Sequence, residues 1–88
     1  MTKHGSTSLK VIARAPFHIY YEGDAVSLSA FNTVGPFDVL PGHADFFSML
    51  TACKVSIDNG IDKDPITFEI RNGILTVRDD EVMLFANI

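Results

Sequence analysis

The sequence predicts an all-β fold, a small two-layer β-sandwich of about eight to ten short strands. Apolar and polar residues alternate with a period of two along most of the chain, which is typical of strands with one buried face. Glycine, proline and aspartate interrupt the alternation at short intervals, as turns do. No window of about ten residues has the period of about 3.6 residues that marks a helix. A sheet with so many strands is expected to fold over on itself into two layers.

The expected strands follow one another closely along the chain. In chain order, the alternating or apolar segments span residues 9–15, 17–22, 26–30, 37–40, 46–50, 53–57, 66–70, 75–77 and 82–86. In the second segment, the alternation places Phe17, Ile19 and Tyr21 on the core side. Residues 46–50 fit either a strand or a single helical turn, because a short apolar run is compatible with both.

Three turns have a residue-level explanation. In Leu40-Pro41-Gly42-His43, Pro41 fixes its own φ at about −65°, and Gly42 can adopt the positive φ that a type II turn requires at its third position. Asn72-Gly73 is the strongest two-residue hairpin signal in the chain and predicts a hairpin between the strands on either side. Asp79-Asp80 marks a further turn.

Length and composition indicate one small domain that works in a reducing compartment. The 88 residues divide into a polar tail, residues 1–8, which we expect to be disordered, and a sandwich over residues 9–88. The net charge is −4 and no basic stripe is present, so nucleic-acid binding has little electrostatic support. No secretory signal or membrane-spanning apolar run is found. The single cysteine, Cys53, lies in an apolar run and is expected to be a buried thiol.

His43 and Asp45 form the one pair that suggests chemistry. In a strand both side chains would face the same side, and a small hydrolase or metal protein could use them as a base or as ligands. A metal site would need a third ligand such as His18, and a triad with Ser48 would be too local for strand geometry. The residues favour a turn histidine that hydrogen-bonds locally or contacts a partner. We therefore expect no catalytic residue, no metal site and no cofactor.

Several expected strands carry apolar side chains on their second face as well. These residues are Ile12, Tyr20, Phe31, Leu40, Phe47, Met83 and Phe85. They are either scattered single exposures, which are normal, or parts of one contiguous patch, which would mark a protein interface. The last segment, residues 82–86, is apolar throughout. If it is an edge strand, it could pair with a second copy of the chain and form a homodimer.

The stretch Leu40-Pro41-Gly42-His43-Ala44 resembles the Leu-Pro-Gly-His-Ala turn in the N-terminal β-domain of the ε subunit of F-type ATP synthases. Similarity extends to the first strand at residues 9–13, the Asn72–Val77 segment and the closing strand at residues 80–87. There are three departures. Pro36 and Asp38 replace an acidic residue and a glycine, a Lys-Pro-Gly is absent near residues 51–53, and the family's C-terminal helical hairpin is missing.

The resemblance implies a non-catalytic central-stalk subunit that binds γ and the membrane c-ring and couples proton flow to ATP synthesis, without the autoinhibitory helices. It would be cytoplasmic and peripheral to the inner or plasma membrane, held there through the complex. The expected γ-binding residues are Pro41, Gly42, His43, Ala44, Met83 and Phe85, and the expected ring-facing loop comprises Asn32, Thr33, Val34, Gly35, Pro36 and Phe37.

Two alternatives accompany this hypothesis. The chain could be an orphan interaction domain with the same fold and a different partner, which the departures at Pro36 and Asp38 favour. It could also be an expressed fragment from which the helices were left out.

Overall fold

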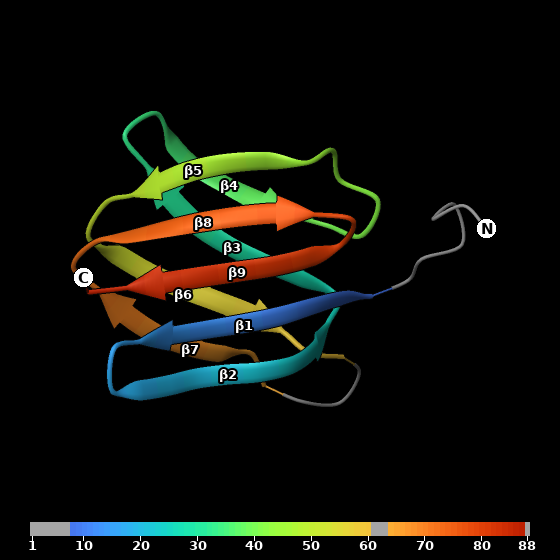
Figure 1. Ribbon diagram of the computed structural model, residues 1–88, viewed down its shortest axis with the longest axis horizontal. Coiled ribbons are helices and arrows are strands. Elements are labelled where there is room, and N and C mark those ends of the chain that lie inside the picture. Colours follow the sequence, from blue (N-terminus) through green and yellow to red (C-terminus); the bar gives the residue numbers. More distant parts are fainter. Residues whose placement is uncertain (1–7, 61–63, 88) are drawn as a thin grey trace.

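The computed structural model describes residues 8–60 and 64–87 and shows a β-sandwich without helices in that part of the chain (Figure 1). No helix there is long and apolar enough to cross a membrane. The strands are β1 (Leu9–Ala15), β2 (His18–Ala25), β3 (Ser27–Asn32), β4 (Gly35–Val39), β5 (Phe46–Leu50), β6 (Cys53–Asp58), β7 (Ile66–Ile70), β8 (Gly73–Arg78) and β9 (Glu81–Ala86). The predicted all-β sandwich is confirmed, and residues 46–50 form a strand. The predicted tail lies outside the described residues, apart from Ser8.

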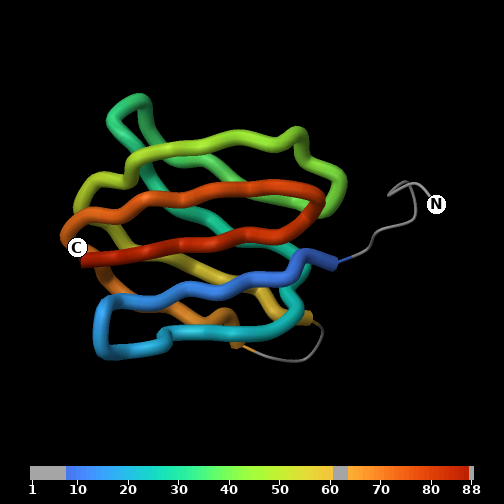
Figure 2. The backbone as a smooth tube through the Cα atoms, viewed as in Figure 1, coloured from blue at the N-terminus to red at the C-terminus, as the bar shows by residue number. Residues whose placement is uncertain are grey.

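The strands form two layers. The five-stranded sheet has the order β2-β1-β9-β8-β5, and the four-stranded sheet has the order β4-β3-β6-β7. Neighbouring strands are antiparallel except for β1 and β9, which pair in parallel. The chain crosses between the layers at Val26 and through residues 40–45, 51–52 and 71–72, which can be followed in Figure 2.

The predicted hairpin at Asn72-Gly73 is wrong. Strand β7 pairs with β6 in one sheet, whereas β8 pairs with β9 and β5 in the other, so this dipeptide connects the two layers. Gly73 is buried, and a Cβ atom added there would lie 3.1 Å from the Phe85 carbonyl oxygen and 3.2 Å from Leu84 Cδ1. The glycine therefore permits close packing of backbone on backbone and does not form a two-residue turn.

The last strand is also placed differently from the expectation. Strand β9 lies between β1 and β8, with backbone pairing on both sides, so it is not an edge strand. Edge-to-edge pairing of residues 82–86 with a second copy is therefore excluded. The parallel pairing of β1 with β9 joins the first and last strands within residues 8–60 and 64–87. No local sequence pattern predicts a contact between strands so far apart in the sequence.

Strand β2 does not keep the predicted alternation. The register slips between Ala13 and Arg14, because Ala13 lies opposite Tyr21 while Arg14 lies opposite Ile19. The extra residue on β2 is Tyr20, which packs against the core together with Tyr21. Phe17 and Ile19 were expected on the core side, but Phe17 is fully exposed in the β1–β2 turn and Ile19 faces outward. A bulge of this kind moves side chains to the other face.

The core between the layers consists of aliphatic residues from both sheets. Its fully buried members include Leu9, Val11, Leu28, Val39, Val55, Ile57, Leu75, Val77, Val82 and Leu84. Aromatic pairs close the two open sides of the sandwich. Tyr20 stacks on Phe68 with ring centroids 4.2 Å apart, and Phe37 meets Phe46 edge-on at 5.9 Å. Cys53 is half-buried at the start of β6, not fully buried as expected.

Candidate partner-binding surface

The outer face of the five-stranded sheet is organised in three rows that run across the strands. The strand register defines these rows. The charged row contains Asp24, Lys10, Glu81 and Arg78, next to the β8–β9 turn. The middle row contains Glu22, Ile12, Met83, Thr76 and Phe47. The far row contains Ile19, Arg14, Phe85, Ile74 and Met49.

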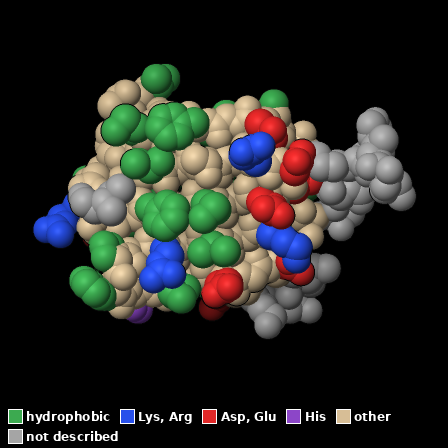
Figure 3. All heavy atoms as spheres, viewed as in Figure 1, with side chains coloured by type: hydrophobic (Ala, Val, Ile, Leu, Met, Phe, Trp, Pro, Cys, Tyr) green, Lys and Arg blue, Asp and Glu red, His purple; other side chains and the backbone are tan. Residues whose placement is uncertain are grey.

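The middle and far rows form a contiguous apolar surface, which we call the apolar face. It consists of Ile12, Ile19, Phe47, Met49, Ile74, Met83 and Phe85. Met49 is 65% exposed and Phe47 is 60% exposed, and Met83 and Phe85 each keep about two fifths of their surface in contact with solvent. Figure 3 shows hydrophobic side chains gathered over this face and charged ones concentrated toward one end. Of the two interpretations of the second-face residues, the contiguous patch is confirmed for Ile12, Phe47, Met83 and Phe85.

The outer face of the four-stranded sheet is polar by comparison. Its outward positions carry Ser27, Ser29, Asp38, Lys54, Ser56, Thr67 and Glu69. Ser29 donates a hydrogen bond to Asp38 Oδ1 at 2.6 Å, so polar groups on this face bind one another. Phe31, at the end of β3, lies opposite the exposed Pro36 of β4, and these two apolar residues stand at one end of the face. The two faces of the sandwich therefore differ in chemistry, and the five-stranded sheet presents the surface suited to a protein partner.

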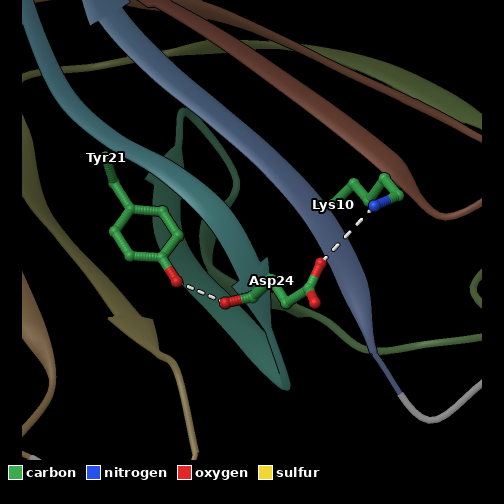
Figure 4. A network of polar contacts seen from close by, with 3 residues as sticks. All are labelled: Lys10, Tyr21 and Asp24. Carbon is green, nitrogen blue, oxygen red and sulfur yellow. Dashed lines mark hydrogen bonds and ion pairs between the residues drawn. The ribbon is translucent and has the colours of Figure 1, made fainter.

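At the charged row, Lys10 Nζ lies 3.7 Å from Asp24 Oδ1, and the Tyr21 hydroxyl donates to the Asp24 carbonyl oxygen (Figure 4). Both charged side chains are more than two thirds exposed, so this ion pair contributes little to stability. The Tyr21 bond fastens the end of β2, an edge strand of the five-stranded sheet. The charged row is thus a solvated border of the apolar face.

The loop of residues 40–45 has the predicted turn and is tied to the β8–β9 turn. The His43 amide donates to the Leu40 carbonyl at 3.1 Å, and Gly42 has a φ of +84°, as a type II turn requires. The Gly42 amide donates to Asp80 Oδ1 at 2.8 Å. In return, Asp45 Oδ1 accepts from the Asp79 amide at 2.9 Å. The sequence alone did not reveal this reciprocal bonding between the two turns.

His43 and Asp45 each bind a backbone group in this structure. The ring of His43 packs 4.8 Å from Phe46, and its Nδ1 lies 2.7 Å from the Ala44 carbonyl oxygen. Asp45 instead binds the backbone of the β8–β9 turn. His18 lies at the opposite end of the strands, against Tyr20. Among the described residues, no three of His, Cys, Asp and Glu gather closely enough to hold a metal ion. His43 is thus a turn histidine bonded locally.

The expected loop over residues 32–37 is shorter than predicted. Strand β3 continues to Asn32 and β4 begins at Gly35, so the turn itself consists of Thr33 and Val34. Asn32 Oδ1 accepts hydrogen bonds from the amides of Val34 at 2.9 Å and Gly35 at 3.2 Å, which closes the turn. Val34 is 94% exposed at the tip, whereas Phe37 packs against the core.

The structure does not bring the six expected γ-binding residues into one cluster. The turn of residues 41–44 lies at the end of the sandwich that holds the β8–β9 turn, whereas Phe85 lies toward the opposite end of β9. Sequence reasoning noted Phe47 on a second face, but it missed Met49, Ile74 and Ile19. Strand alternation identifies such outward side chains. Only the pairing order of the strands shows that they adjoin.

These features define a class of protein domain. It is a small β-sandwich with one apolar outer face and a proline-glycine turn that is hydrogen-bonded to the β8–β9 turn. A family model described as the β-sandwich domain of the ATP synthase delta/epsilon chain matches residues 8–88. The chain belongs to this family, which confirms the resemblance to the ε N-terminal domain.

Relatives and solved structures agree with this assignment. The ATP synthase epsilon chain of Clostridium novyi (strain NT) is 32% identical over 81 residues, covering 90% of this chain and 58% of that protein. A mitochondrial ATP synthase central stalk and c-ring structure from Tetrahymena thermophila contains a chain with a TM-score of 0.76 and 13% identity, covering 91% of this chain and 63% of that one. A chain in a Euglena gracilis mitochondrial ATP synthase structure has a TM-score of 0.83 and 15% identity. That match covers 91% of this chain and 51% of the other. This chain therefore spans between half and two thirds of the length of these proteins.

Proposed function

We propose that this chain is a non-catalytic central-stalk component of an F-type ATP synthase. It binds the γ subunit through the apolar face and through the adjoining turn of residues 41–44. By joining γ to the membrane c-ring, it mechanically couples proton flow to ATP synthesis. It performs no chemistry itself. In this role it is held at the membrane through the complex.

The observation that carries the proposal is the chemical difference between the two outer faces, taken together with family membership. Met49 and Phe47 are exposed beside Met83 and Phe85. Such a contiguous exposed apolar patch marks a site of protein interaction. Burial of apolar surface contributes about 25 cal/mol per Å², so a partner that covers this face gains substantial free energy. The polar face of the other sheet remains in water in this arrangement.

The β3–β4 hairpin is the element we assign to the c-ring. Its tip presents Val34, which is almost fully exposed, at the end of the sandwich opposite the turn of residues 41–44. Pro36 and Asp38 stand on β4 where the family usually carries an acidic residue and a glycine. A ring contact made here therefore relies on the Val34 tip and not on an acidic side chain.

The test is co-purification and then titration of the γ subunit from the same genome with the wild-type chain and with Phe85→Ala. We expect a one-to-one complex, and we expect Phe85→Ala to weaken it by about tenfold, because truncation of a well-packed residue near the centre of an interface costs more than about 1 kcal/mol. His43→Ala tests the contribution of the turn in the same assay.

Phe31→Ala is the matched control, because Phe31 is 43% exposed and Phe85 is 41% exposed, on opposite outer faces. Equal weakening by the two variants would contradict the assignment of the face. No complex with γ, from a chain whose circular dichroism confirms the β fold, would favour an orphan domain that binds another protein.

A further inference from the structure

We infer that the apolar face receives an amphipathic helix of its partner, laid across the strands, with Lys or Arg on the flank toward the charged row and a carboxylate opposite Arg14. This inference rests on the proposed function in that it takes the apolar face as the working surface. It goes further in that it states the shape and the charges of the element that the face binds.

The dimensions of the face suit one helix. The apolar residues of the middle and far rows are two positions apart along each strand, a spacing of about 7 Å, which one helix of about 10 Å diameter covers. Five strands separated by about 4.8 Å span about 19 Å across the sheet, which equals about 13 helical residues. The rows run across the strands, so the axis of the helix does too.

Arg14 requires a partner in any complex that covers the far row. It stands between Ile19 and Phe85 in that row, it is half-buried, and its Nε donates only to the Ala15 carbonyl at 3.4 Å. It makes no ion pair within residues 8–60 and 64–87. A helix that buried Phe85 would also desolvate this guanidinium, and an unpaired buried charge is strongly destabilising. A carboxylate on the helix offsets that cost through a charge-assisted hydrogen bond.

The other flank of the helix faces an excess of negative charge. Along the border next to the β8–β9 turn, Asp24, Asp45 and Glu81 are set against Lys10 and Arg78, so the acidic residues outnumber the basic ones. Lys10 is already paired with Asp24. Lys or Arg on the helix flank complements this border and accelerates association by electrostatic attraction. The two flanks carry opposite charges, so the face also fixes the direction in which the helix runs.

The first arm of the test titrates γ against Arg14→Gln and Asp45→Asn at low and high salt. Asn at position 45 keeps the oxygen that accepts from the Asp79 amide, so that variant removes the charge alone. We expect Arg14→Gln to weaken binding about threefold to tenfold, mainly through faster dissociation. Asp45→Asn should slow association by a smaller factor that shrinks as salt rises. Lys54→Gln and Glu69→Gln, on the polar sheet, are the matched controls and should leave both rates unchanged.

The second arm uses two synthetic helical peptides of about 14 residues with one leucine stripe. One peptide has Lys on one flank and Glu on the other, and the second has Gln at those positions. With the isotope-labelled chain, we expect amide shifts confined to β1, β2, β5, β8 and β9 and at least threefold tighter binding of the charged peptide. If γ binds but Arg14→Gln and Asp45→Asn behave like the controls, the inference is overturned and the proposed function stands.

If γ does not bind, the proposed function fails and the peptides decide the inference. Shifts on the apolar face that are stronger for the charged peptide support it. Equal binding of both peptides, shifts on the four-stranded sheet or no shifts at all overturn it.

Discussion

At the scale of single residues, the backbone conformation at a turn restricts which side chains can occupy it. Asp79 and Asp80 both adopt positive φ, +51° and +64°, in the turn between β8 and β9. Positive φ at both central residues is the signature of the tight turns whose twist matches that of the flanking strands. Aspartate tolerates this region better than most residues, because its side chain hydrogen-bonds nearby backbone. The predicted Asp79-Asp80 turn therefore follows from residue chemistry, and Asp80 also holds the Gly42 amide.

The strain at Asp79 can be measured with two variants that both remove its carboxylate. We expect Asp79→Ala to have a free energy of unfolding about 1 kcal/mol lower than Asp79→Gly, because only alanine places a Cβ in the left-handed region. Urea unfolding of both proteins gives the difference directly. Equal stability of the two variants would show that this turn relaxes to another conformation.

At the scale of elements, the alternation of side chains along each strand places one set of residues in the core and the other set on the outer face. Strand β5 shows this on adjacent residues, because Leu50 is 4% exposed and faces the core, whereas Met49 is 65% exposed on the apolar face. The sequence could assign such alternation to most strands. It failed in β2, where the bulge at Tyr20 reverses the face of the residues before it.

Strand β5 gives a prediction that separates folding from binding. We expect Leu50→Ala to lower the free energy of unfolding by about 2–5 kcal/mol, since it leaves a cavity in the core. We expect Met49→Ala to change it by less than about 0.5 kcal/mol, because its side chain is largely in water. Denaturant titration measures both. A large loss of stability for Met49→Ala would mean that the apolar face is covered in the free protein.

At the scale of the whole molecule, the sandwich carries the two proposed binding regions on different sheets. The apolar face belongs to the five-stranded sheet, whereas the β3–β4 hairpin extends from the four-stranded sheet. Rigid two-layer packing with an aliphatic core holds these regions at fixed positions. A stalk component requires such rigidity if it is to transmit rotation between two partners.

Because the two regions share no residues, substitutions in them should act independently. We expect Val34→Asp to weaken retention by isolated c-ring in detergent and to leave γ affinity unchanged within about twofold. Phe85→Ala should have the opposite pattern. Parallel pull-down assays with γ and with the ring measure both. Loss of γ binding in Val34→Asp would show that the hairpin belongs to the γ interface.

The sequence by itself determined the all-β class, most strand positions, the type II turn at Pro41-Gly42 and the resemblance to the ε N-terminal domain. All of these depend on local chemistry: alternation within a strand, the fixed φ of proline, or the positive φ available to glycine. It also pointed to Met83 and Phe85, because an apolar residue on the second face of a strand is visible without any partner strand.

Only the tertiary structure decided which strands adjoin. The parallel pairing of β1 with β9, the division of β7 and β8 between two sheets, and the bulge in β2 involve residues far apart in the chain or the pairing of a whole strand. Such choices depend on how the two layers fill their common core, and no short segment contains that information. The apolar face exists for the same reason: five strands contribute to it, and their order makes it continuous.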